Sequence, residues 1–220
     1  MTKGSGRDER LLGVQIAEQL RQGILRGDWK PGSRIQQDRL AEQFGASRIP
    51  VREALRLLEN EGLVVLVPNS SAWISKLDKA ECIEVYMMRE RLEPLALAQS
   101  VAHLSDGDIG ELSALAARAR VTPDIEDYIQ LDRELHLLSV RRAPMPRLLT
   151  TIERFWNITQ PYRRNYLATT GAEGRWISDV EHTLMIEAIK RRDAEEAGRM
   201  LGAHIRRTRL HLEQAAWVAE

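Results

Sequence analysis

Residues 47–55 read SRIPVREAL, and this stretch has the pattern of the start of a short amphipathic helix. Ser47 suits the N-cap position because its hydroxyl can accept a hydrogen bond from a backbone N–H that lacks a partner within the helix. Pro50 falls in the first turn, where a proline removes no helical hydrogen bond. The apolar residues of the inner face follow at helical spacing: Val51, Ala54, Leu55 and Leu58. The stretch therefore predicts a helix that begins at about Arg48 and ends at Gly62.

The segments on both sides of this helix complete a small domain. Helical spacing of apolar residues predicts two earlier helices at roughly 10–26 and 36–44, with a Pro-Gly turn between them. After the third helix, the β-rich runs 63–67 and 72–75 flank a turn-forming segment and predict a hairpin. Three helices and a hairpin, with two of the helices joined by a tight glycine turn, form a winged helix-turn-helix.

From residue 78 onward the strand signals disappear and the sequence is helical throughout. Asp78-x-x-Glu81 and Asp193-x-x-Glu196 are capping-box patterns that mark two of the helix starts. The helices are expected at roughly 78–100, with a bend at Pro94, and at 105–120, 124–141, 146–168, 175–191 and 193–217. We therefore expect a mainly α protein: an N-terminal winged helix-turn-helix domain, residues 1–77, and a C-terminal all-α bundle of six or seven helices, residues 78–220.

The composition is that of a globular protein without a strong overall charge. The 32 Lys and Arg residues balance 32 Asp and Glu residues, so no net field draws the whole molecule to nucleic acid or to an anionic membrane. Any site for a polyanion must therefore be a local patch. Cys82 is the single cysteine, which excludes an intrachain disulfide and predicts a buried, inert thiol. The polar N-terminus lacks the apolar core of a signal peptide, and no stretch approaches the ~20 apolar residues of a membrane span, so we expect a cytoplasmic protein with no membrane partner.

Arg48 and Arg52 lie one turn apart at the front of the helix that would enter the DNA major groove. Guanidinium groups there can bond guanine edges or clamp phosphates, and Ser47 can add its hydroxyl or its backbone N–H. In the alternative interpretation these arginines are ordinary solvated residues, since Glu53 and Arg56 show that the same surface carries paired charges. The ordered set of helices, glycine turns and hairpin favours DNA binding.

The segment PGSRIQQDRLAEQFGASRIPVREALRLLENEGLV, residues 31–64, resembles the DNA-binding domain of GntR-family transcriptional regulators, and the similarity extends over about residues 10–77. The resemblance implies binding to double-stranded operator DNA, with Arg48 and Arg52 at positions that contact DNA in the family. It also implies that Arg39, on the preceding helix, contacts a phosphate or a base. The wing departs from the family pattern: Pro-Asn-Ser-Ser at 68–71 lacks the Gly and Arg common at the tip, so a minor-groove contact does not carry over.

Three histidines and one aspartate form a possible metal-binding set in the second half of the chain. Asp132 precedes His136 by four residues, a spacing that stacks a carboxylate and an imidazole on one helix face. His182 and His204 sit among apolar residues of the last two expected helices. Two interpretations are open from the residues alone: a shared metal site, or a surface Asp-His pair together with packed, hydrogen-bonded core histidines.

This half also resembles the FCD ligand-binding domain that follows the DNA-binding domain in one large GntR subgroup, over about residues 78–215. The resemblance rests on four short motifs: Arg89-x-x-Leu92-Glu93-Pro94, Asp132-x-x-x-His136, Glu181-His182 and Ala203-His204. Many FCD domains hold a divalent metal through one Asp and three His. The resemblance implies the same role for Asp132, His136, His182 and His204. Arg192-Asp193 departs from the Gly-Asp that is common between the last two helices.

Such a metal site suggests an effector. Three imidazoles and one carboxylate leave open positions on a five- or six-coordinate ion, which a small carboxylate can fill. Arg89 can pair with a second acidic group of that ligand, and the equal alternative is a salt bridge to Glu93 one turn later. Asn157, Tyr162 and Arg163 are further candidates for the pocket. Ligand type alone does not distinguish Zn, Ni, Mn and Fe.

Two functions from different classes are compatible with these features. In the first, the protein is a homodimeric, ligand-controlled transcriptional regulator whose two recognition helices enter successive major grooves. In the second, it is a metal-dependent hydrolase or another metalloenzyme with an appended DNA-binding head. The sequence places no acid or base beside the metal set and contains no nucleophile motif or phosphate loop. We therefore expect a regulator and not an enzyme.

Overall fold

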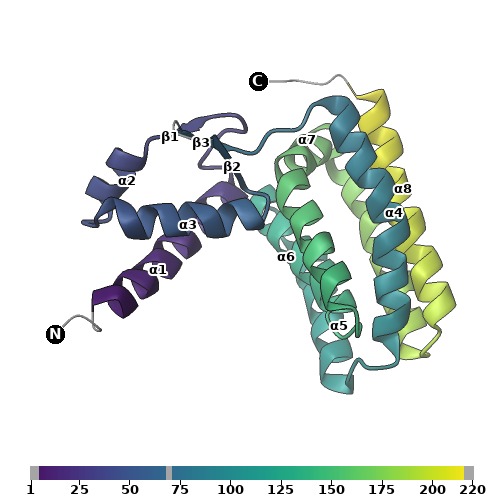
Figure 1. Cartoon of the computed structure of the whole chain (residues 1–220). Helices are drawn as coiled ribbons and strands as arrows, with labels where there is room; N and C mark the ends of the chain where they lie inside the picture. The colour runs from purple at the N-terminus through teal and green to yellow at the C-terminus, as the bar shows by residue number, and fades with distance from the viewer. Residues whose placement is uncertain (1–4, 68–70, 216–220) are drawn as a thin grey trace. The chain divides into compact units, whose positions relative to one another are not determined.

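The structure is a computed structural model of the chain, and it describes residues 5–67 and 71–215. The chain divides between Leu77 and Asp78 into two compact units, which are traced in Figure 1. The expected fold class, a mainly α chain with a winged helix-turn-helix followed by a helical bundle, is confirmed. Most of the expected wing tip, residues 68–70, lies outside the described residues. Among the described residues, no helix combines the length and the apolar character needed to cross a membrane.

The N-terminal unit has three helices and a small antiparallel sheet. Its elements in chain order are α1 (Ser5–Arg26), β1 (Arg34–Ile35), α2 (Gln37–Gln43), α3 (Arg48–Asn60), β2 (Val64–Val67) and β3 (Ser71–Ile74). The strand order is β1-β3-β2, so β3 is the central strand and pairs with both neighbours. The sequence analysis missed β1, because two residues are too few to show a period of two.

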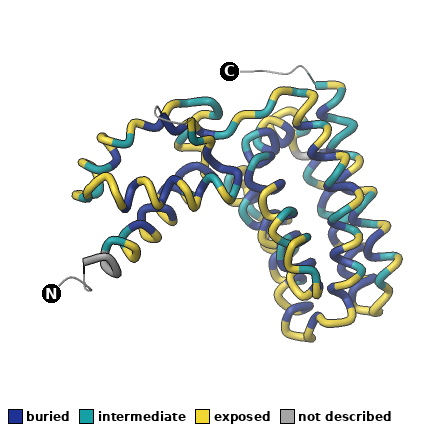
Figure 2. The backbone as a smooth tube through the Cα atoms, viewed as in Figure 1, coloured by how far each residue is buried: buried dark blue, intermediate teal, exposed yellow. Residues whose placement is uncertain are grey.

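The core of this unit lies where α1, α3 and the sheet face one another, and the buried stripes are dark blue in Figure 2. The inner stripe expected for α3 is confirmed, since its four apolar residues and Pro50 are buried. The tight glycine turn expected between two of the helices is present at Gly45, with φ 57°, and the glycine expected to end α3 is present at Gly62, with φ 78°. A residue with a side chain rarely adopts this left-handed backbone conformation. This explains why a glycine follows each of the two helices.

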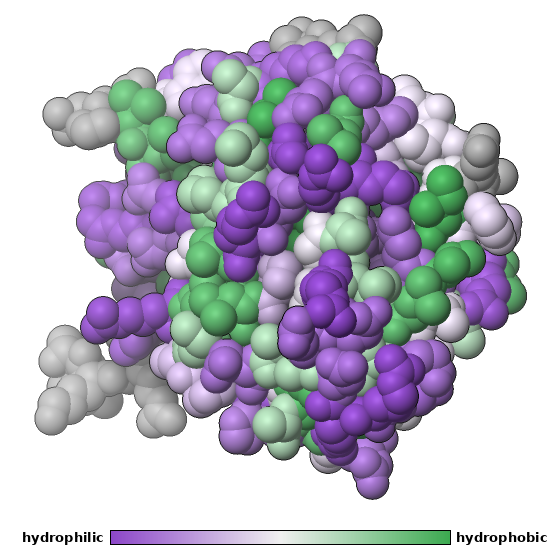
Figure 3. All heavy atoms as spheres, turned by 90° about the vertical axis from the view of Figure 1, so that its right-hand side faces the viewer, coloured by the Kyte–Doolittle hydropathy of each residue, from purple (hydrophilic) through white to green (hydrophobic). Residues whose placement is uncertain are grey.

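The second unit is a helical bundle. Its elements are α4 (Lys79–Val101), α5 (Asp106–Val121), α6 (Ile125–Val140), α7 (Pro146–Lys190) and α8 (Ala194–Gln214). α4 packs along α8, and α7 contacts α8, α5, α4 and α6. The face drawn in Figure 3 carries hydrophilic side chains over most of its area, with hydrophobic ones in separate groups. Cys82, on α4, is fully buried as expected.

The expected helix starts are largely confirmed. Asp78 and Glu81 form both hydrogen bonds of a capping box, each 2.8 Å long. Asp193 accepts a hydrogen bond from the backbone N–H of Glu196 at 2.9 Å. α4 continues as one helix through Pro94, whose expected bend stays a prediction.

The two helices expected at 146–168 and 175–191 are joined into α7. The helix is interrupted at Gly171, whose backbone has φ 59° and ψ −150°. The hydroxyls of Thr169 and Thr170 both donate to the carbonyl of Tyr166, at 2.9 Å. These bonds satisfy the two hydroxyls within the helix, and the segment lacks the apolar period from which a helix is inferred.

The turn between α7 and α8 has an arginine in a position that favours glycine. Arg192 has φ 60°, in the left-handed region. Its guanidinium donates to the carbonyl of Val101, the last residue of α4, at 2.9 Å, and to that of Leu104, in the connection to α5, at 2.5 Å. The side chain thus forms contacts that offset the backbone strain, which explains how the turn forms without the usual glycine.

Candidate functional site

The front of α3 has the expected exposed cations. Ser47 is the N-cap residue, with an extended backbone at φ −75° and ψ 171°. The side-chain hydrogen bond that we expected from Ser47 is absent, which corrects the sequence analysis. Because this end of the helix is exposed, water can satisfy its backbone N–H groups at a cost of about 1 kcal/mol. The hydroxyl and the helix N-terminus therefore both face solvent.

Arg48 and Arg52 both lie on the solvent side of α3. Arg48 Nε lies 2.6 Å from Asp38 Oδ1 on α2, in an ion pair with both side chains more than two-thirds exposed. Such an exposed pair is worth little in water, so Arg48 can exchange Asp38 for a phosphate at small cost. The structure gives Arg52 no ion-pair partner among the described residues.

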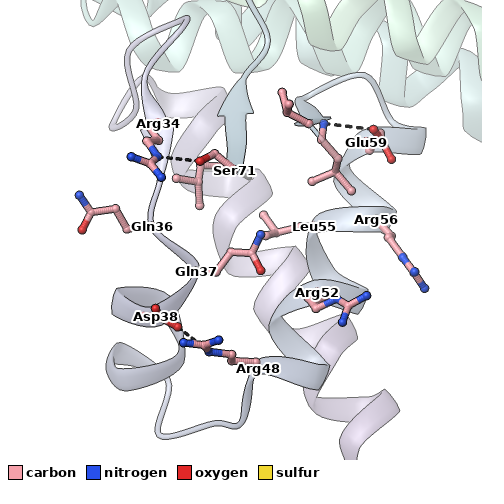
Figure 4. Close-up of a pocket in the computed structure, with 13 residues that line it drawn as sticks. Arg34, Gln36, Gln37, Asp38, Arg48, Arg52, Leu55, Arg56, Glu59 and Ser71 are labelled. Atoms are coloured by element: carbon pink, nitrogen blue, oxygen red, sulfur yellow. Dashed lines mark hydrogen bonds and ion pairs between the residues drawn. The ribbon is translucent and has the colours of Figure 1, made fainter. Parts of the chain in front are cut away.

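These arginines line a groove of about 950 Å³ between α2, α3 and the sheet, drawn in Figure 4. Its charged residues are Arg34, Arg48, Arg52, Arg56, Asp38 and Glu59. Four guanidinium groups against two carboxylates make this surface locally cationic on a chain without net charge. Arg39 is exposed on α2 but is not among the residues that line the groove. Arg34 was missed by the sequence analysis, because β1 was missed.

The histidines and the aspartate meet in the core of the bundle. Asp132 and His136 come from α6, His182 from α7 and His204 from α8, and all four are buried. Their ligand atoms all lie within 4.8 Å of one another. His182 Nε2 lies 3.2 Å from His136 Nε2 and 3.4 Å from Asp132 Oδ1. The tertiary structure therefore brings together the whole set that the sequence analysis named.

This donor set fits one divalent cation. Metal–imidazole bonds of about 2.0–2.1 Å place two neighbouring ligand nitrogens roughly 3.0–3.4 Å apart, and the two Nε2 atoms have such a separation at 3.2 Å. Burial lowers the pKa of His182 to about 3, and it holds the pKa of His136 well below its ordinary value. Burial raises the pKa of Asp132, but the charges of Arg163 and the three histidines together outweigh it, so the pKa falls below its usual range. Neutral imidazoles and an ionised carboxylate are the forms that bind metals.

Charged partners surround this cluster and fix its side chains. His204 Nδ1 lies 2.7 Å from Glu181 Oε2, which turns Nε2 toward the cluster. Arg207 donates to both oxygens of Glu181, at 2.8 Å and 2.6 Å. Burial raises the pKa of Glu181, but its hydrogen bonds and charge interactions with His204 and Arg207 together outweigh burial and lower the pKa to about 2. Arg163 pairs with the second oxygen of Asp132, which leaves Oδ1 facing the histidines.

The residues proposed for the effector lie beside the cluster. Arg89 is buried, its Nε is 2.5 Å from Glu93 Oε1, and its Nη1 donates to Thr159 Oγ1 at 3.0 Å. The salt bridge to Glu93, one of the two alternatives, is thus formed, and the contact with an effector stays a prediction. Arg89 and Arg163 both lie over the ring of Trp156, at 4.2 Å and 4.4 Å from its centroid.

The other two candidates are also buried. Asn157 accepts a hydrogen bond from Arg133 at 2.6 Å, and Tyr162 is 8% exposed. The sequence analysis missed Gln160, whose amide oxygen and nitrogen are buried without a hydrogen-bond partner among the described residues. A partnerless buried amide is costly, and a polar ligand is one way to satisfy it. Its spacing of three residues from Arg163, on the same face of α7, is the signal that could have revealed it.

Comparisons with known proteins agree with this architecture. The sequence model of the FCD domain matches residues 84–207, and the one described as bacterial regulatory proteins, gntR family, matches residues 12–74. The chain is 32% identical over 188 residues to the HTH-type transcriptional regulator McbR of Escherichia coli (strain K12), covering 84% of this chain and 85% of McbR. It is 30% identical over 207 residues to the HTH-type transcriptional regulator YdhC of Bacillus subtilis (strain 168), covering 91% and 90%.

A solved structure supports the same conclusion. The structure of E. coli McbR/YncC aligns with a TM-score of 0.78 and 30% identity, covering 92% of this chain and 97% of that chain. These relatives are described as transcriptional regulators and not as enzymes, as the sequence analysis expected. The winged helix-turn-helix and the histidine-containing bundle are therefore the two parts of a DNA-binding transcriptional regulator, and the chain belongs to the GntR family, with a C-terminal FCD domain.

Proposed function

We propose that this regulator is a homodimer whose affinity for operator DNA is controlled by a small carboxylate effector, bound at a divalent metal in the FCD domain. Residues 1–77 bind the DNA in the cytoplasm, and residues 78–220 bind the effector and form the dimer. One observation carries the proposal: four buried ligand atoms, from Asp132, His136, His182 and His204, lie within 4.8 Å of one another. The burial of so many ionisable groups costs free energy unless they are paired with one another or bind a shared cation.

The DNA contacts belong to four residues of the helix-turn-helix. Arg48 and Arg52 point away from the core at the front of α3, and the groove beside them is cationic. Ser47 presents its hydroxyl and the helix N-terminus, which attract a phosphate. Arg39 is exposed on α2 and is suited to a contact with the backbone beside the groove.

The effector contacts belong to the bundle core. A bound divalent cation would supply open coordination positions for a carboxylate. Arg163 and Arg89 are buried cations beside the cluster, each paired with one carboxylate, Asp132 and Glu93. A second carboxylate of the ligand can compete for these guanidinium groups. Asn157 and Tyr162 complete the proposed pocket.

α4 is the element that can report ligand binding to the DNA-binding unit. Arg89 and Glu93 lie on this helix, which begins one residue after the boundary at Asp78. A ligand that displaces Glu93 from Arg89 changes the contacts of α4 directly. To control transcription, the ligand must bind the two states with affinities that differ by about 1–3 kcal/mol.

The proposal is tested with the untagged full-length protein. An operator duplex is first selected from a random pool, and DNA binding is then measured with metal-loaded and chelated protein during titration with simple mono- and dicarboxylates. We expect at least one acid to change operator affinity by about fivefold or more, and only in the metal-loaded protein. An acid response of equal size after complete metal removal contradicts the metal-bound effector. Light scattering at the working concentration tests the dimer, and a monomer bound to a full palindrome contradicts it.

A further inference from the structure

Arg34 lies on β1 of the small sheet, and its side chain lines the groove beside α3. The hairpin segment 63–75 contains neither Lys nor Arg, so its own strands offer no positive charge. β1 pairs with the central strand, with Arg34 opposite Trp73. Ile35, the next residue, is 1% exposed and points into the core. Because successive side chains on a strand point to opposite faces, Arg34 is directed outward.

Backbone bonds around β1 hold this position firmly. The N–H of Gly32 donates to the carbonyl of Ile74 at 3.0 Å, and the N–H of Ile74 donates to the carbonyl of Ser33 at 2.9 Å. The base of the Arg34 side chain is thus attached to the centre of the sheet. A guanidinium on a fixed strand loses less entropy on binding a ligand than one on a flexible tip.

A buried hydroxyl orients the guanidinium itself. Nε of Arg34 donates to Ser71 Oγ at 2.8 Å, and Ser71 is 4% exposed. This bond uses Nε and leaves the two Nη groups for another acceptor. Arg48 and Arg56 have acidic partners, Asp38 and Glu53, whereas the structure gives Arg34 none among the described residues.

We propose that Arg34 contacts a backbone phosphate of the bound DNA and that Ser71 positions it to do so. Arg34 lines the same groove as Arg48 and Arg52, and in Figure 4 it lies across the groove from Arg56. Base edges are read by α3, whereas the sugar-phosphate strands border the groove that receives this helix, so a cation on the sheet meets a phosphate. Arg34 thus supplies from β1 the charge that the hairpin lacks. The inference rests on DNA binding by this domain and names one further contact.

The test compares Arg34→Ala with wild type in the full-length protein. Two duplexes of equal length are used, the selected operator and an unrelated sequence, and the dissociation constants are measured from 50 to 300 mM NaCl. A lost phosphate contact lowers the slope of log affinity against log salt by about 0.9 and affinity by about tenfold at 50 mM for each protomer bound, so a bound dimer is expected to lose about twice that slope. We expect these losses on both duplexes alike, because a phosphate carries no sequence information.

Three further variants separate the contact from other effects. Arg26→Ala removes the same charge from the exposed end of α1, outside the groove, and is expected to leave the slope near the wild-type value. Arg34→Lys keeps the charge and is expected to retain most of the slope. Ser71→Ala keeps the charge but not its orientation, and is expected to weaken binding to both duplexes a few-fold. Thermal unfolding of each variant checks the fold.

The possible contradictions are distinct. If Arg34→Ala matches Arg26→Ala in slope and affinity, Arg34 does not contact DNA. If its loss is confined to the operator duplex, Arg34 reads a base and the phosphate assignment is wrong. If wild type binds neither duplex in a salt-dependent manner, DNA binding by the domain fails, and this outcome is visible before any variant is compared.

Discussion

The Nε2 atoms of His136 and His182 lie 3.2 Å apart, although 46 residues separate them in the chain. Burial lowers the pKa of both imidazoles, which favours the neutral forms that bind a metal. A divalent cation between the two Nε2 atoms would accept a lone pair from each ring, which is the basis of the first two predictions.

Removal of one imidazole is expected to lower the metal content. His182→Ala leaves three ligands and an open face, and His204→Ala has the same effect from α8. His103 is exposed and is not part of the cluster, so His103→Ala is the matched control. Elemental analysis of untagged protein gives the metal per chain. Full metal content in both cluster variants would show that the metal binds elsewhere.

Metal removal is expected to destabilise the protein. A cation that binds the folded state at 100 times its dissociation constant contributes about 2.7 kcal/mol, which a chelator abolishes. The midpoint of thermal unfolding should fall on chelation and recover when metal is restored. In His182→Ala, the midpoint should be nearly insensitive to the chelator. An equal shift in wild type and in this variant would assign the stabilisation to another site.

Glu181 is expected to tune the affinity of the metal site without binding the metal. It accepts from His204 Nδ1 and from Arg207, so Glu181→Gln keeps the shape but weakens the orientation of His204. Loss of such an outer contact lowers metal affinity about 10- to 100-fold. Competition with a chelating dye measures this change. Glu187→Gln is the control, because Glu187 is exposed on the same helix and bonds Lys190.

Arg52→Ala is expected to remove specific operator binding while the fold survives. Arg52 is exposed, so its loss leaves no cavity, whereas a lost bidentate contact with guanine costs about 1–3 kcal/mol in each half-site. Affinity for an unrelated duplex should fall much less. DNase footprints at the selected operator, together with circular dichroism, provide the measurement. If the variant still protects the operator from DNase, α3 does not recognise the operator sequence through Arg52.

Arg192 is expected to show two opposing effects. Its left-handed backbone favours glycine, whereas its side chain donates hydrogen bonds to the carbonyls of Val101 and Leu104. Arg192→Ala loses the bonds and keeps the strain, and Arg192→Gly loses the bonds and relieves the strain. The glycine variant should therefore be more stable than the alanine variant by about 1 kcal/mol. Equal free energies of unfolding for the glycine and alanine variants would show that the backbone at position 192 is not strained.

Cys82 is expected to resist alkylation in the folded protein. Burial raises the pKa of its thiol to about 12, and the nearby Arg89 offsets only part of this rise. The protonated thiol is the stable form below that value, so the reactive thiolate is scarce at pH 8 and becomes tenfold more abundant with each pH unit. Labelling with iodoacetamide, read by mass spectrometry, should be slow at pH 8 and rapid after unfolding in urea. Rapid labelling of the native protein would contradict the burial.

Local pattern was enough to predict several parts of this structure. The apolar stripe that includes Val51 and Leu55 predicted the buried face of α3. Arg48 and Arg52 lie outside this stripe, so they were predicted to be exposed. Asp78 and Glu81 gave the start of α4, because a capping box needs only residues three positions apart. Resemblance to FCD domains, and not periodicity, selected the four metal-ligating candidates among several acids and histidines.

Other parts could not be read from pattern. Ser47 has the right residue type and backbone for a cap, yet forms no side-chain cap bond, and its exposed helix end leaves the backbone N–H groups to solvent. β1 is too short to show a period, and the groove position of Arg34 depends on its pairing with β3. The α7 segment just before Gly171 is helical although its threonines show no apolar period, so a hydropathy pattern does not reveal it.

The sequence by itself determined most of the helices, several of their starts and stops, and the apolar face of α3, because these follow from contacts within four or five residues. The tertiary structure decided which faces meet. It alone brings His136, His182 and His204 to one point, joins Glu181 to Arg207, and sets Arg34 beside Ser71. A helical period fixes the direction of a side chain around its own axis, but the packing of whole helices and strands fixes what that side chain contacts.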